Sequence, residues 1–279
     1  MDIDQLEFKC LNQLGVNTLV DWAAEEGWNP GIHDAWLFYQ ADPDGFFGCY
    51  HDGEMIAGGS IVSYNGEFGC MGLFIVKPEY RSRGIGRQLW FKRRDMLLSR
   101  LKDEAPIGMD GVVGMQPFYN QGGFEIAFRD ERYERIGREY SVSEKVCPLG
   151  DDSFGEASDL DRRCFGFARP QFLKPWLNQP DSKSFQYRTS GGLQGFVLMR
   201  KAKDGYKIGP LFADNSEVAE DLYKACLDSA IDEPVYLDIP VSNSDAVAMV
   251  KKFEAEYVFE CARMYYGSSP KVELENVFG

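Results

Sequence analysis

The segment from residue 68 to residue 101 constrains the fold of this 279-residue chain more than any other. Its residues Leu73 to Val76 are apolar and partly β-branched, as is typical of a buried strand. Pro78 ends that strand, because proline has no N–H to donate to a neighbouring strand. Helical spacing of apolar residues then begins at Ile85. The order of strand, turn and helix predicts a mixed α/β arrangement around this turn.

The turn itself, which runs from Arg81 to Gly86, combines glycine with basic residues. Gly84 and Gly86 let the backbone approach a ligand closely. The first turn of a helix also leaves N–H groups unpaired and carries a partial positive charge, which suits a phosphate. Arg81, Arg83 and Arg87 add side-chain cations that bind phosphate well. The sequence therefore predicts a cradle for pyrophosphate at this helix N-terminus.

The predicted helix over 85–101 has an apolar face with basic residues interleaved. A dinucleotide-binding fingerprint is disfavoured, because G-x-G-x-x-G would follow the strand directly, with an acidic residue about 20 positions later. A Walker A loop is absent, because no Gly-Lys-Ser/Thr occurs. The basic residues between 81 and 94 are interpreted as surrounding the anion. The helix carries apolar Leu89, Met96, Leu97 and Leu101, with Lys92, Arg93 and Arg94 between them.

Arg81-x-x-Gly84-x-Gly86 after an apolar strand resembles the acetyl-CoA motif of the GNAT N-acetyltransferase superfamily. The resemblance implies acetyl-CoA as co-substrate, no metal, and a GNAT domain over residues 1–137. It also implies that backbone N–H groups of the strand polarise the thioester carbonyl, as preorganised donors do in an oxyanion hole. The expected cofactor-binding residues are Phe74, Ile75 and Val76 on the strand and Arg81, Arg83, Gly84, Ile85, Gly86 and Arg87 in the cradle.

The length of the chain suggests two domains, at about 150 residues each. Residues 138–153 read as a linker, and residues 154–279 resemble the C-terminal GNAT-like domain fused to some GNAT enzymes. The order of strands and helices recurs in the two halves, as expected for a diverged repeat or for two unrelated α/β domains. Each domain is predicted to have a central mixed, largely antiparallel sheet flanked by helices. The acidic stretch from Ala213 to Glu217 replaces the glycine turn, so we expect no pyrophosphate site there.

The net charge of −14 argues against nucleic acid and anionic membranes as partners. It fits either a cationic amine substrate steered by the field or simple solubility. Seven scattered cysteines without a C-x-x-C read as reduced thiols. No run of about 18 apolar residues and no signal peptide is seen, so a cytoplasmic protein is predicted. With only two histidines, His33 and His51, a zinc site or a Ser-His-Asp triad is poorly supported.

Tyr119 is the predicted general acid. The segment from Phe118 to Phe124, Phe-Tyr-x-x-x-Gly-Phe, is similar to the GNAT segment whose tyrosine lies near the CoA sulfur. A phenol with a pKa of about 10 is neutral at pH 7 and can protonate a departing thiolate. The alternative is a core tyrosine. The preceding stretch, Gly114-Met115-Gln116-Pro117, leaves little room for a full helix and puts Pro117 in its first turn, and the asparagine often found there is absent.

The general base stays open between Glu67, Asp110 and a chain of water molecules. Asp238 and Arg263 could face a cleft between the domains or be structural. Aromatic residues of the first fifty positions could line an acceptor pocket, because aromatic rings hold ammonium groups, or could pack the core. This last set comprises Trp22, Trp28, Trp36, Phe38, Tyr39, Phe46 and Phe47.

These observations together predict an acetyl-CoA-dependent N-acetyltransferase. The acceptor is expected to be a small primary amine that attacks directly in a ternary complex, with the second domain supporting the acceptor cleft. Two alternatives are a non-catalytic acyl-CoA-binding sensor and an enzyme that acylates protein lysines or N-termini. The acceptor, the acyl chain length and the oligomeric state are not determined by the sequence.

Overall fold

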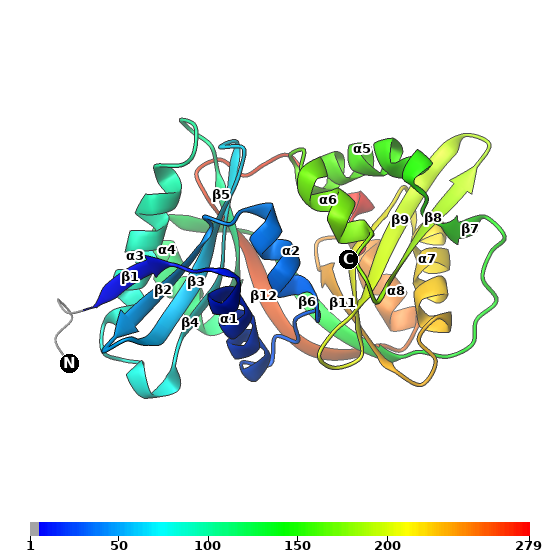
Figure 1. The fold of residues 1–279 in the computed structure, drawn as a ribbon. Helices are drawn as coiled ribbons and strands as arrows, with labels where there is room; N and C mark the ends of the chain where they lie inside the picture. The colour runs from blue at the N-terminus through cyan, green and yellow to red at the C-terminus, as the bar shows by residue number, and fades with distance from the viewer. Residues whose placement is uncertain (1–5) are drawn as a thin grey trace. The chain divides into compact units, whose positions relative to one another are not determined.

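A computed structural model describes residues 6–279 of the chain. It divides into two compact units (Figure 1). The first unit extends to Glu125 and includes Met264–Ser269, and the second comprises Ile126–Arg263 and Pro270–Gly279. No helix in residues 6–279 is both long and apolar enough to cross a membrane.

The sheet of the first unit contains both antiparallel and parallel pairs of strands. Its order is β1-β2-β3-β4-β5, with the end of β12 beside β5. Neighbouring strands β1 to β4 pair antiparallel, whereas β4 and β5 run parallel. The bounds are β1 Glu7–Cys10, β2 Phe46–His51, β3 Glu54–Tyr64, β4 Phe68–Val76, β5 Ile107–Val112 and β12 Glu256–Tyr266.

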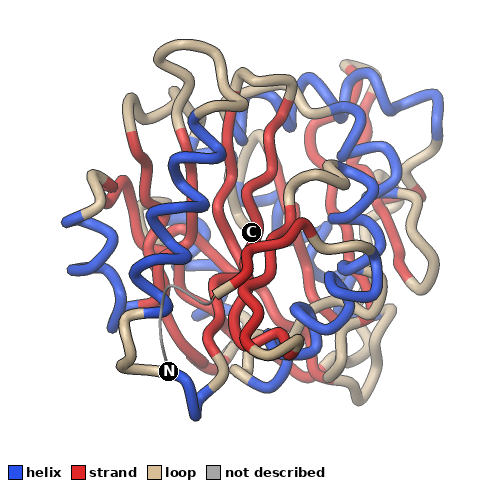
Figure 2. The backbone as a smooth tube through the Cα atoms, turned by 60° about the vertical axis from the view of Figure 1, so that its left-hand side comes forward, coloured by secondary structure: helices blue, strands red, loops and turns tan. Residues whose placement is uncertain are grey.

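Helices cover both faces of this sheet (Figure 2). One core cluster joins Leu19 of α1 to Val62 of β3 and Ile75 of β4, with Phe38 of α2 packed against it. The other joins Leu89 of α3 to Ile56 of β3. The helices are α1 Gln13–Glu25, α2 Asp34–Ala41, α3 Ile85–Leu98 and α4 Gln116–Gln121, with 3₁₀ turns at Pro78–Tyr80 and Val113–Met115.

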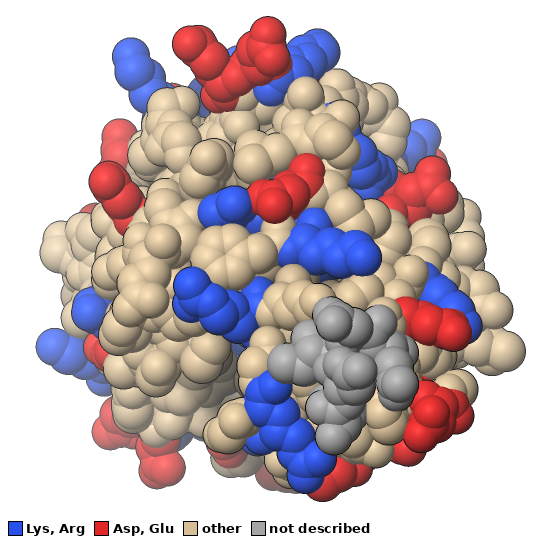
Figure 3. All heavy atoms as spheres, turned by 90° about the vertical axis from the view of Figure 1, so that its left-hand side faces the viewer, with Lys and Arg blue, Asp and Glu red and all other residues tan. Residues whose placement is uncertain are grey.

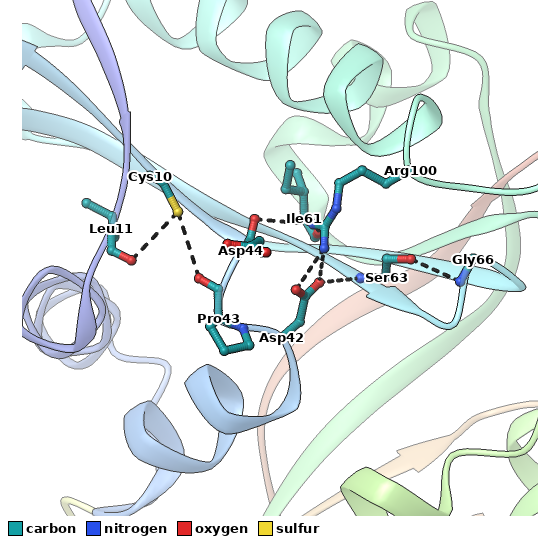
Figure 4. A network of polar contacts seen from close by, with 9 residues as sticks. All are labelled: Cys10, Leu11, Asp42, Pro43, Asp44, Ile61, Ser63, Gly66 and Arg100. Carbon is teal, nitrogen blue, oxygen red and sulfur yellow. Dashed lines mark hydrogen bonds and ion pairs between the residues drawn. The ribbon is translucent and has the colours of Figure 1, made fainter.

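An ion pair joins the segment that follows α3 to the loop before β2. Arg100 donates to both oxygens of Asp42, at 2.7 and 2.8 Å, and to the carbonyl of Ile61 at 2.9 Å (Figure 4). Asp42 also accepts from the backbone N–H of Ser63 at 2.8 Å. The network lies at the β3–β4 hairpin end of the sheet and stabilises the first unit there.

The second unit repeats the mixed sheet and its helical cover. Its strand order is β12-β6-β11-β10-β9-β8-β7. β10 and β11 pair parallel, whereas the pairs β6–β11, β9–β10, β8–β9 and β7–β8 are antiparallel. Leu222 of α7 and Met249 of α8 pack on Val197, Leu211 and Leu237 of the sheet. The elements are β6 Phe124–Ile136, β7 Val146–Pro148, α5 Phe154–Phe165, α6 Pro170–Leu177, β8 Ser182–Thr189, β9 Gly192–Lys201, β10 Tyr206–Ala213, α7 Ser216–Asp228, β11 Pro234–Pro240 and α8 Ser244–Lys252, with 3₁₀ turns at Asp151–Ser153 and Leu274–Asn276.

The predicted fold class is confirmed, and several predicted elements lie where the local signals put them. The strand over 68–76 and the helix start at Ile85 agree with the structure. Asn215 and Asn243 cap their helices, because their side chains accept from backbone N–H groups of the first turn. For α1 the cap is Asn12, whose side chain accepts from the N–H of Gly15 at 3.1 Å.

Candidate active site

The parallel strands β4 and β5 separate soon after they meet. Their paired residues are Gly69 with Ile107 and Cys70 with Gly108, although β4 continues to Val76 and β5 to Val112. Gly72, Leu73 and Phe74 are partly exposed in succession, which breaks the alternation of faces along a regular strand. We call this divergence of β4 and β5 beyond Cys70 and Gly108 the first splay.

A β-bulge lies in β4 at the mouth of the first splay. Gly58 pairs with Ile75 and Ser60 pairs with Gly72, so β4 holds one more residue than β3 across this interval. Leu73, inside the bulge, has a φ of +48°. A positive φ is uncommon for a residue with a side chain and marks a locally imposed backbone.

The glycine turn between β4 and α3 is open at the helix N-terminus. Gly84 is the N-cap of α3, with a φ of +83° that favours glycine. Its carbonyl accepts from the N–H of Gln88 at 3.1 Å, so the N–H groups of residues 85 to 87 precede the first bond within the helix. A Cβ on Gly86 would lie 3.3 Å from both Phe74 and Val76, which shows how closely the turn packs on β4. The backbone therefore fits an anion here.

The arginines of this turn differ in how they are held. Arg81 donates through Nε to the carbonyl of Val76 at 2.8 Å and pairs with Glu26. Arg83 and Arg87 are exposed, with their guanidinium carbons 5.6 Å from the Tyr80 ring and 5.0 Å from the Phe91 ring. Arg81 thus braces the turn against β4 and α1, whereas Arg83 and Arg87 reach solvent. Figure 3, which views the molecule from the left of Figure 1, shows Lys and Arg side chains with Asp and Glu among them on that face.

Arg93 corrects the interpretation that the basic residues of α3 surround the anion. Its side chain is buried, with 1% of the residue exposed. It lies four positions after Leu89 and four before Leu97, so helical geometry places all three on the buried face. That spacing could have revealed the burial from the sequence, since the triplet Lys92-Arg93-Arg94 looks solvated only when read without the helix period.

Tyr119 lies in the short helix α4, which has Pro117 in its first turn, as the sequence suggests. Its ring stacks on Trp90, with the centroids 6.1 Å apart and the planes at 25°. Burial raises the pKa of Tyr119 to about 12, and the charge of Arg93 opposes that rise. The phenol therefore stays protonated at neutral pH and can donate a proton.

The two candidate bases occupy different ends of the sheet. Glu67 precedes β4 at the β3–β4 hairpin, and its hydrogen bond to Lys102, at 2.8 Å, lowers its carboxyl pKa. Asp110 lies on β5 beyond its last pair with β4, which is the arm of the first splay opposite the bulge. The structure thus places Asp110 on a splayed strand and Glu67 at the far end of β4.

The other predicted residues have structural contacts. In the second unit Asp238 accepts both bonds of a bidentate pair with Arg132, at 2.5 and 2.7 Å. The Arg263 guanidinium lies 5.8 Å from the Phe165 ring. Among the early aromatics, Trp36 is 48% exposed on α2. Five others belong to the core on the α1 face or pack against it, and these are Trp22, Trp28, Phe38, Tyr39 and Phe46. Over residues 6–279 no group of His, Cys, Asp and Glu is arranged to hold a metal ion.

The second unit contains a matching divergence of strands that is filled by the chain itself. β10 and β11 pair from Tyr206 to Ile208 and then separate, which we call the second splay. The N–H of Leu211 donates to the carbonyl of Gly279 at 2.7 Å, and the N–H of Phe278 donates to the carbonyl of Leu211 at 2.9 Å. Phe278 is fully buried, and Gly279 packs against Leu237 of β11. We call residues 277–279 the filling segment.

Comparison with known proteins gives the family. A family model described as "Acetyltransferase (GNAT) family" matches residues 15–124, and one described as "Acetyltransferase (GNAT) domain" matches residues 157–279. A relative from Pseudoalteromonas sp. (strain SANK 73390), named holothin acyltransferase, is 28% identical over 259 residues, covering 92% of this chain and 86% of the relative.

Solved structures agree on the fold. A putative acetyltransferase from Pyrococcus horikoshii superposes with a TM-score of 0.84 at 22% identity, over 100% of this chain and 95% of that one. A tandem GNAT protein from the clavulanic acid biosynthesis pathway superposes with a TM-score of 0.67 at 13% identity, over 95% and 99% of the two chains. The chain therefore belongs to the GNAT superfamily, as an N-acyltransferase built of two GNAT domains.

Proposed function

We propose that the protein transfers an acetyl group from acetyl-CoA to a primary amine, and that the first unit binds the donor. One observation carries this proposal. The first splay lies next to the N-terminus of α3, where the N-cap Gly84 has no side chain to bind the first N–H groups. The N–H groups of residues 85 to 87 would bind the pyrophosphate, with Arg83 and Arg87 as nearby cations. The open backbone of β4 would bind the chain that leads from the pyrophosphate to the thioester.

The second unit supports this assignment by showing what such a splay accepts. In both units the strand register resumes after the bulge, at Ile75 in β4 and at Leu211 in β10. Leu211 uses its N–H and its carbonyl to bind an extended peptide, the filling segment. The pantetheine arm of coenzyme A is also an extended chain with amide groups. By the same geometry, Ile75 and its neighbours Phe74 and Val76 would bind that arm.

Acyl transfer forms a C–N bond to the amine and breaks the C–S bond of the thioester, so sulfur must gain a proton and nitrogen must lose one. Tyr119 would supply the proton to sulfur, because its raised pKa keeps the phenol protonated near pH 7. Asp110, on the splayed β5, and Glu67 stay the candidate bases, with a chain of water as the alternative. Backbone N–H groups of β4 would polarise the carbonyl.

The acceptor is proposed to be a small primary amine, handled in a ternary complex in the cytoplasm. A net charge of −14 favours a cationic acceptor over an anionic one. The relative named holothin acyltransferase carries a name that specifies acyl rather than acetyl transfer. Donors longer than acetyl-CoA therefore belong in the same assay.

Calorimetric titration of acetyl-CoA into the wild type and two charge-reversal variants tests the donor site. Arg87→Glu puts a carboxylate in the first turn of α3, where it does not weaken the helix but repels phosphate. We expect affinity to fall about 10- to 100-fold. Lys92→Glu, with the same change of charge on the exposed side of α3, is the matched control and should leave the affinity within about threefold.

Turnover with a panel of amines then separates the candidate functions. An enzyme acting on small amines releases free CoA with at least one of them. Tight binding without turnover of any amine or peptide would favour an acyl-CoA sensor. Turnover confined to peptide lysines or N-termini would favour a protein acylase. A wild type that binds no acetyl-CoA would contradict the proposal itself.

A further inference from the structure

Arg93 is a buried cation in the first unit whose role neither the fold nor the proposed chemistry requires. Its Nη2 donates to the carbonyl of Gly72 at 2.9 Å and to that of Ser60. These two residues form the register pair on one side of the β4 bulge. The guanidinium thus binds one carbonyl on each strand at the point where β4 leaves its regular register.

This placement is costly for stability. Nε and Nη1 of Arg93 are buried and have no hydrogen-bond acceptor within the described part of the chain. Burial lowers the pKa of Arg93 to about 10, which reflects the penalty on its charged form. Buried charges are normally paired with an opposite charge, and an apolar residue of similar volume is often more stable at such a site. Stability alone therefore does not account for arginine here.

The surrounding backbone is shaped to hold the guanidinium. Gly59 faces it from β3, and a Cβ at that position would lie 2.2 Å from the guanidinium carbon. Phe74 of β4 places its ring centroid 5.5 Å from the same carbon. Gly59 and Phe74 both lie within the bulged interval between Gly58 and Ile75. The bulge and the arginine consequently fit each other as one unit.

The corresponding bulge in the second unit is held by a different donor. In β10 the register shifts between Ile208 and Leu211, with the same excess of one residue over its partner β9. There the carbonyl of Gly209 accepts from the neutral indole N–H of Trp176 at 3.1 Å. The second splay is filled by peptide. At the β4 bulge a guanidinium donates to the strand carbonyls directly, whereas at the β10 bulge an indole donates and the guanidinium of Arg200 lies 4.5 Å from its ring.

We propose that Arg93 is a positioning residue for acyl transfer, holding the β4 bulge so that the backbone from Leu73 to Val76 faces the first splay. This inference rests on the proposed function, because that backbone is the surface assigned to the donor. The charge of Arg93 also acts on Tyr119, whose pKa is raised by burial and lowered by Arg93. One side chain would therefore set both the strand that holds the thioester and the environment of the acid.

The test compares Arg93→Met and Arg93→Lys with the same two substitutions at Arg100. Arg100 is a suitable control because it also donates to a β3 carbonyl, that of Ile61, but at the hairpin end of the sheet. We expect Arg93→Met to lower kcat on the order of 100-fold, as a displaced reacting geometry does. Arg93→Lys, which keeps the positive charge and N–H donors on a single nitrogen, should recover most of that loss. The Arg100 variants should lower Tm while kcat stays within about threefold.

Hydrogen exchange of peptides covering residues 70–78 gives a second readout, which needs no acetyl-CoA and also reports on whether each variant folds. Exchange there should become faster in Arg93→Met than in Arg100→Met. Equal kcat losses at the two positions, or an unchanged kcat in Arg93→Met, would overturn the proposal. If the wild type itself neither binds nor turns over acetyl-CoA, the proposed function fails. Exchange at 70–78 then decides alone whether Arg93 holds the bulge, and equal rates in the two Met variants would refute it.

Discussion

In the first unit β4 and β5 separate after Cys70 and Gly108, and in the second unit β10 and β11 separate after Ile208 and Leu237. Each leading strand carries a bulge with one extra residue just beyond that point. The backbone device is therefore the same in both. What differs is the occupant, since the filling segment takes the open edge of β10, whereas none of the described residues pairs with β4 beyond Cys70 on the β5 side.

The helix that follows each splayed strand shows a second difference. Gly84 caps α3 without a side chain, so the first N–H groups of the helix stay available. Asn215 caps α7 with its own side chain, which accepts from the N–H of Val218 at 3.1 Å, and Glu217 adds negative charge in the first turn. A capped and acidic N-terminus has little capacity left for phosphate. The two units thus differ in the cap and the occupant and share the sheet, and this difference is what the proposed donor site depends on.

The largest expected effect is on kcat, and it should distinguish a tyrosine of the first unit from one of the second unit. Tyr119→Phe should lower kcat by about 10²- to 10⁴-fold, the usual contribution of a positioned general acid. The affinity for acetyl-CoA should stay within a few-fold, because only the hydroxyl is lost. Tyr223→Phe is the matched control, since Tyr223 is also buried and its pKa is also raised by burial. Steady-state kinetics measures both, and equal kcat values in the two variants would exclude Tyr119 as the acid.

The same assignment has a pH signature. A general acid must be protonated, and a raised pKa extends the protonated form to higher pH. With a pKa of about 12, Tyr119 stays protonated throughout the range from pH 6 to pH 10. The wild-type kcat should therefore show no fall caused by this acid up to pH 10. A descending limb centred below pH 10 would assign the proton transfer to a different group.

A smaller but substantial effect on stability is expected from removing the aromatic ring of the filling segment. Phe278→Ala removes a fully buried ring and should destabilise the protein by about 3–5 kcal/mol. Val258→Ala, at a site that is 43% exposed in the same unit, should cost under about 0.5 kcal/mol. Urea unfolding measures both. Calorimetry should still find one acetyl-CoA per chain in Phe278→Ala, and a second bound molecule would show that the filling segment alone keeps the second unit from binding the donor.

Local signals predicted a good part of this architecture. The strand that ends at Val76 could be predicted, because the apolar residues, Pro78 and the glycine turn all indicate the same end. Asn215 and Asn243 are caps of the same local kind, since each capping side chain lies within three residues of the N–H groups it binds. The family resemblance also rested on a contiguous motif, and the comparisons confirmed it.

Contacts between distant segments were not predictable in this way. The filling segment binds Leu211 from more than sixty positions away in the sequence, and nothing local to either partner specifies the pairing. Arg81 was expected to contact phosphate, but the structure pairs it with Glu26 at the C-cap of α1, and its role toward the donor stays a prediction. Arg93 was predictable only in part, because the helical period places it on the buried face of α3 whereas its charge suggests exposure to solvent. Only the bulge, formed by residues of two other strands, explains why a cation is buried there.

The smallest expected effect concerns the cap that distinguishes the two helices. Asn215→Ala removes the side-chain acceptor for Val218 and should destabilise the protein by about 1 kcal/mol in urea unfolding. Asn243→Ala should destabilise the protein more, because Asn243 also donates to the carbonyl of Glu275 and to that of Val277 in the filling segment. Neither change should alter acetyl-CoA affinity, since Glu217 and the filling segment remain. If Asn215→Ala instead gained a second, weak acetyl-CoA site, the cap alone would be what keeps phosphate from α7, and the filled splay would have no part in the difference between the units.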